Sequence, residues 1–95
     1  MDEIDTKIDN LKTESEEKVA LRDALLYRHR ILRFSDELTQ NIRHSQEMFN
    51  DILADITEYD NYCANHPNFV NQKAVMSEEN IKRIYRKCLE ERDFL

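Results

Sequence analysis

Apolar residues recur at alternating spacings of three and four positions from Leu21 to Cys63, with charged and polar residues between them. This spacing gathers the apolar side chains on one face of a helix, and its persistence over six heptads is typical of a coiled coil. Neither proline nor glycine interrupts the chain from Asp2 to Cys63, so no strong helix-breaking signal is present. The pattern predicts one long coiled-coil helix over residues 1–64, about 90 Å in length.

We expect this stripe to be a self-associating seam. A helix of that length cannot pack within a chain of 95 residues, so a second copy is expected to cover it, as a homodimer. The predicted oligomer interface consists of Leu21, Ala24, Ile31, Leu38, Ile42, Phe49, Ile52, Ile56 and Tyr59. Arg28, Ser35 and Ser45 interrupt this interface, and polar residues at such positions set register or partner choice.

Further apolar residues widen the stripe on both sides. They are Leu25, Tyr27, Leu32, Phe34, Met48 and Leu53. A helix that is apolar on more than one side has several neighbours, as in a bundle or a folded-back hairpin. The first turns carry Ile4, Ile8 and Leu11 in another phase, and residues 1–23 hold eight acids and four bases. We therefore expect a change of register near the acidic N-terminal end.

The stretch YDNYCANHPNFVNQ, residues 59–72, contains Pro67, the only proline of the chain. A residue before proline is disfavoured in the helical region and asparagine favours turns, so NHPNF indicates a corner. We expect a corner loop over residues 65–76, followed by a second helix over residues 77–95. Ser77 is a suitable N-cap for that helix, with acidic residues directly after it.

The second helix also has one apolar face, and a short connection favours antiparallel neighbours. We expect it to fold back on residues 45–63 and to form, with the corner, a patch that binds a protein partner. The predicted hairpin and partner patch consists of Tyr62, Phe69, Val70, Ile81, Ile84, Tyr85 and Cys88. The predicted fold class is all-α: a long coiled-coil helix and a short helix folded back as a helical hairpin or bundle, in a dimer.

The amino-acid composition of the chain excludes or disfavours several classes of function. The chain has no glycine, which excludes glycine-rich phosphate loops of the P-loop and Rossmann kinds. The net charge of −6 disfavours general affinity for nucleic acid or an anionic membrane. No apolar run approaches the roughly 18 residues of a membrane helix, so no membrane insertion is expected. The acidic N-terminus lacks the apolar region of a signal peptide.

Candidate chemistry is sparse. Cys63 and His66 are close in sequence, and Cys88 would approach them if the second helix folds back, which gives three ligand types that suit zinc. A fourth ligand stands out only weakly, at Asp60 or Asp93, and cysteines on an apolar face act as small hydrophobic residues. We expect reduced thiols in an intracellular protein, no metal or other cofactor, and no catalytic residues. A zinc-stabilised corner is the alternative.

The predicted function is a non-catalytic oligomerisation and protein-interaction segment of a larger intracellular scaffold or adaptor, of the cytoskeletal, centrosomal or kinetochore type. Its expected partners are a second copy of itself and another protein that binds the C-terminal hairpin, and its expected location is the cytoplasm. Polar Arg28, Ser35 and Ser45 within the seam motivate an alternative. In that hypothesis the chain is a regulatory helical arm that docks on an enzyme or a small GTPase in a hetero-complex, as trafficking adaptors do.

Overall fold

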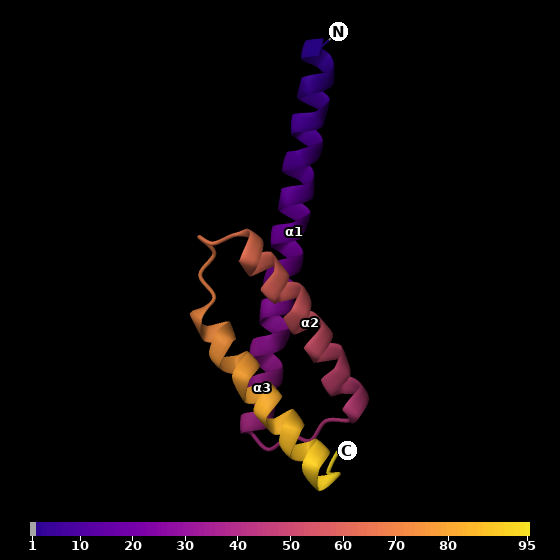
Figure 1. The fold of residues 1–95 in the computed structure, drawn as a ribbon, viewed down its shortest axis with the longest axis vertical. Coiled ribbons are helices and arrows are strands. Elements are labelled where there is room, and N and C mark those ends of the chain that lie inside the picture. Colours follow the sequence, from indigo (N-terminus) through magenta and orange to yellow (C-terminus); the bar gives the residue numbers. More distant parts are fainter. Residues whose placement is uncertain (1) are drawn as a thin grey trace.

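Three helices make up the structure, a computed structural model that describes the backbone of residues 2–95 and the side chains of residues 13–95. Helix α1 spans Asp2–Thr39, α2 spans Gln46–Asn65 and α3 spans Gln72–Glu91 (Figure 1). Helices α2 and α3 lie along the C-terminal half of α1, and the N-terminal half of α1 projects beyond them. The prediction of an all-α helical bundle is confirmed, and no strand occurs within residues 2–95.

The chain reverses direction between α1 and α2, where the sequence predicted a continuous helix over residues 1–64. Asn41 adopts a φ of 63°, and the Ile42 N–H donates to the Glu37 carbonyl oxygen at 2.9 Å. This is a Schellman ending, in which asparagine tolerates the left-handed conformation that usually requires glycine. Ser45 then caps α2, because its hydroxyl oxygen accepts from the Met48 N–H at 3.1 Å. The predicted long helix is therefore wrong.

Replacing Ser45 with alanine is expected to lower the free energy of unfolding by about 1 kcal/mol, since the Met48 N–H loses its acceptor. Ser45→Asp is the matched control, because aspartate retains an acceptor at the cap and should stay within a few tenths of a kcal/mol of the parent chain. Urea denaturation of the three chains measures the difference. Equal losses in both variants would contradict the capping role.

The reversal brings the two parts of the predicted seam together within one chain. The core consists of Ala24, Ile31, Phe34, Phe49, Ile52, Ile56, Tyr59, Ala74 and Ile81. The first three belong to α1, the next four to α2 and the last two to α3. The same apolar spacing that predicted pairing between two chains is thus satisfied by α1 packing on α2 and α3 of its own chain.

Helix α3 differs from its prediction in both start and neighbour. It begins at Gln72 and contains Ser77 in its interior, because Ala74 is fully buried and extends the apolar face by two turns. Helix α3 packs mainly on α1 and contacts α2 at fewer places, whereas the sequence placed it on residues 45–63. The Asn80 side-chain amide donates to the buried Ser35 hydroxyl of α1 at 3.0 Å, which fixes this pairing.

The C-terminal residues close the base of the bundle. Arg92 ends α3 in the left-handed conformation with a φ of 52°. The Leu95 N–H then donates to the His44 carbonyl oxygen at 3.1 Å, and the Arg43 guanidinium binds the Asp93 carboxylate at 2.5 Å. These contacts tie the end of the chain to the connection between α1 and α2.

Candidate interaction surfaces

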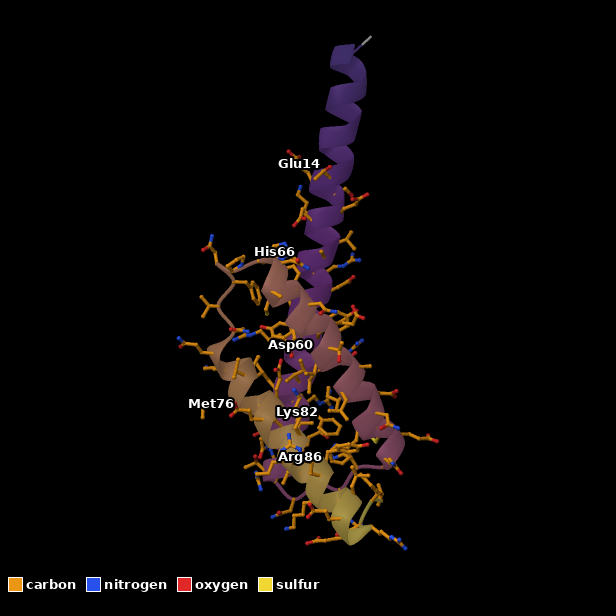
Figure 2. All side chains as sticks on the ribbon, viewed as in Figure 1. Glu14, Asp60, His66, Met76, Lys82 and Arg86 are labelled. Carbon is orange, nitrogen blue, oxygen red and sulfur yellow. The ribbon has the colours of Figure 1, made fainter. Side chains whose placement is uncertain are left out.

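Helix α1 carries an arm, residues 2–16, that extends past the bundle. Figure 1 shows this part of α1 beyond the ends of α2 and α3, and Figure 2 marks Glu14 on it, above the corner that contains His66. The molecule is correspondingly elongated, with extents of 64 × 24 × 18 Å. Isolated helices of about 15 residues are marginal in water, so a helix of this length gains stability when it packs on a partner.

Below the arm, α1 exposes apolar side chains on the side that faces away from α2 and α3. Leu25 and Leu26 are 48% and 46% exposed, whereas the adjacent Ala24 is 1% exposed and faces the core. Val19 and Leu21 are also exposed. We call the exposed set the outer face of α1; it consists of Val19, Leu21, Arg22, Leu25, Leu26 and Arg33. Leucines grouped within a charged rim are typical of protein–protein interaction sites.

Most residues of the predicted oligomer interface lie elsewhere, inside the single chain. Ala24, Ile31, Phe49, Ile52, Ile56 and Tyr59 are buried in the core, and Leu38 is partly buried against it. Only Leu21 and Ile42 of that set are exposed. In this fold the buried residues have no surface for a second chain, because α2 folds back on α1 and covers them.

The predicted hairpin patch is also largely packed. Ile81 is fully buried, and Val70 is the one residue of the patch that is mostly exposed. The others pack partly buried against the core: Tyr62, Phe69, Ile84, Tyr85 and Cys88. At the corner, the rings of Tyr62 and Phe69 meet edge to face at 5.2 Å. The structure therefore uses these aromatics for local packing and leaves little of them on the surface.

His66 joins the corner to the base of the arm. Its Nε2 lies 3.0 Å from Glu17 Oε2 of α1, its Nδ1 lies 2.8 Å from the Tyr62 carbonyl oxygen, and its ring stacks on Tyr62. The Glu17 carboxylate, and next the Tyr62 carbonyl, raise the pKa of His66, because both favour the doubly protonated ring. Sequence reasoning considered His66 as a zinc ligand and missed Glu17, which is distant in the chain.

A polar cluster occupies the middle of the bundle, and the sequence analysis did not identify it. Glu78 of α3 is 6% exposed, and its Oε1, Arg28 Nε of α1 and Tyr59 Oη of α2 are buried without a hydrogen-bond partner. Burial, and next the neighbouring Asp60, raise the pKa of Glu78 to about 8. The available signal was the position of Glu78 between Ala74 and Ile81, on the core face of a helix that starts early.

The possible metal ligands of residues 13–95 lie apart from one another. No three His, Cys, Asp or Glu side chains in this range gather as metal ligands would. Cys63 and Cys88 are free, partly buried thiols, and burial raises the pKa of Cys88, which disfavours the reactive thiolate. Within the described part of the chain, no helix has the length and apolar character to cross a membrane.

Among residues 13–95, His44 is the one histidine whose side chain is buried. Its Nε2 lies 2.9 Å from Glu37 Oε2, and its ring packs on Phe34 at 4.1 Å. This contact holds the connection between α1 and α2 against α1, so its role is structural.

Comparison with models of protein families, with curated proteins and with solved structures finds no match to this chain.

Proposed function

We propose that this chain is a non-catalytic helical interaction module whose binding element is α1. The three-helix bundle acts as a base that holds the arm and the outer face of α1 in one continuous helix. The observation that carries this proposal is that α1 runs beyond its bundle (Figure 1) and presents half-exposed leucines, Leu25 and Leu26, on the side away from α2 and α3.

The physical reason is that both parts of α1 gain from a partner. The arm projects beyond α2 and α3 (Figure 1), and a helix of its length is stabilised chiefly when an apolar face is covered. Its sequence carries Ile4, Ile8 and Leu11 at helical spacing. Covering apolar surface contributes roughly 25 cal/mol per Å², so a partner helix along α1 would gain stability by removing the exposed Leu25 and Leu26 from water.

The wider role that we propose is that of a scaffold or adaptor segment in the cytoplasm, of the cytoskeletal, centrosomal or kinetochore kind. Its support is architectural, since an elongated helical module with extents of 64 × 24 × 18 Å suits assembly. The acidic arm favours a second candidate, a regulatory element that docks on a basic surface of an enzyme or a small GTPase, because six of its fifteen residues are acids.

A photo-crosslinking residue at position 15 of the arm tests the binding role in cells. Defined adducts should form with the parent chain and disappear when Leu25→Asp and Leu26→Asp are combined, because these changes place charge on the outer face. Met48→Asp is the matched control: Met48 is 47% exposed, like the two leucines, but belongs to α2. The proposed function would be contradicted if no adducts form, or if they persist when Leu25→Asp and Leu26→Asp are combined.

A further inference from the structure

We infer that the outer face of α1 is covered by the arm of a second copy of this chain, with the two α1 helices antiparallel. This inference depends on the proposed function and names its partner. The two parts of α1 are similar in length and both carry apolar residues at helical spacing, and the charge of each part complements the other part and not itself.

Charge divides α1 into two opposite segments. The arm, residues 2–16, contains six acids and two bases. Residues 18–33, which include the outer face, contain five bases and one acid. Among these bases, Arg22 and Arg33 have side chains that are 77% and 74% exposed. Antiparallel pairing places each acidic arm along the basic segment of the other copy, whereas parallel pairing places acids on acids and bases on bases.

The apolar residues satisfy the same arrangement. Each arm supplies the apolar series Ile4, Ile8 and Leu11, and each outer face supplies the half-exposed Leu25 and Leu26. One chain therefore offers two complementary halves, an acidic apolar helix and a basic apolar face. A two-fold axis lets two copies use both halves at once, which is the condition for a closed dimer.

Length and position agree with this pairing. The arm spans about 22 Å and residues 18–33 about 24 Å at 1.5 Å per residue, so each arm can cover the basic segment of the other copy. The two-fold axis then crosses near Glu17. Two Glu17 carboxylates would approach each other there, but each already lies 3.0 Å from His66 Nε2 of its own chain. That contact reduces the repulsion at the axis.

Sedimentation equilibrium of the chain of 95 residues tests the inference. We expect a dimer whose dissociation constant rises with salt, because opposite charges meet across the interface. Combining Leu25→Asp with Leu26→Asp should raise the dissociation constant by at least about tenfold, and combining Arg22→Glu with Arg33→Glu should do the same. The control Met48→Asp should leave it unchanged. A cooperative urea unfolding transition, followed by circular dichroism, shows that the three-helix bundle of each variant remains folded.

Spin labels on Thr6→Cys, in a chain that also carries Cys63→Ser and Cys88→Ser, report the orientation. Antiparallel pairing about Glu17 separates the two labels by about 33 Å, whereas parallel pairing brings them to about 10 Å. A monomer at all concentrations, a short label distance, or a dimer that tolerates both double changes would overturn the inference. A monomer whose position-15 adducts still require the outer face would overturn the second copy as partner and leave the proposed function intact.

Discussion

Replacing Phe49 with alanine is expected to lower the free energy of unfolding by about 3–5 kcal/mol, a large part of the stability of a small domain. Phe49 is 1% exposed, and its ring connects every part of the bundle. It lies 5.1 Å from the Phe34 ring of α1, 5.6 Å from the Tyr85 ring of α3 and 5.7 Å from the Phe94 ring of the C-terminal tail. Truncation leaves a cavity at the point where these elements meet.

Urea denaturation followed by circular dichroism measures this loss. Met48→Ala is the matched control, because Met48 precedes Phe49 on α2 but is 47% exposed, and we expect its effect to stay within about 0.5 kcal/mol. A similar small effect for Phe49→Ala would show that α2 does not pack on α1 as described.

The variant Phe49→Ala also distinguishes two arrangements of the apolar stripe, packing between two chains and packing within one chain. In the arrangement predicted from the sequence, Phe49 faces a second chain, so its truncation would reduce the mass of an oligomer. In the structure, Phe49 faces α1 and α3 of its own chain, so its truncation destabilises the fold of the monomer. Comparing the mass and the unfolding midpoint of one variant therefore distinguishes a seam between chains from a core within one chain.

The helical fold class could be predicted because helical spacing, the absence of glycine and the corner at Pro67 are local properties of the sequence. The path of the chain could not be predicted so directly. A stripe at spacings of three and four is satisfied equally by another chain or by the same chain folded back. Asn41 and Ser45 determine which of the two occurs, because Asn41 ends α1 and Ser45 begins α2, so the chain folds back on itself. Both residues permit a turn, but neither requires one, so the reversal went undetected.

The candidate interaction surfaces could also be predicted only in part from the sequence. The acidic N-terminal end with its own apolar phase was visible in the sequence and became the arm. The neighbours of Glu78 and His66 were not visible, because Asp60 and Glu17 approach them only after the three helices pack against one another. Glu78 was also assigned to the first turn of a helix that in fact starts at Gln72, which moved it from the expected surface into the core.

Stability is expected to fall as the pH rises from about 5 to about 8.5, and Glu78 is the main cause. Its carboxyl has a pKa of about 8 in the folded chain against an ordinary value of 4.5, so the folded state holds a proton that the unfolded state releases. The stabilising contribution is complete below 4.5 and is lost as the pH passes through 8. Its charged surroundings are Asp60 of α2, and Glu79 and Lys82 of its own helix.

The variant Glu78→Gln should remove most of this dependence, because glutamine remains neutral at every pH in the range. Near pH 8.5 it should unfold with a free energy on the order of 3 kcal/mol above that of the parent chain, and near pH 5 the two should be similar. Urea denaturation at both pH values provides the measurement, with Glu90→Gln, an exposed residue of the same helix, as the control. If Glu78→Gln loses stability as steeply as the parent between these values, Glu78 is ionised in the folded chain and is not the cause of the pH dependence.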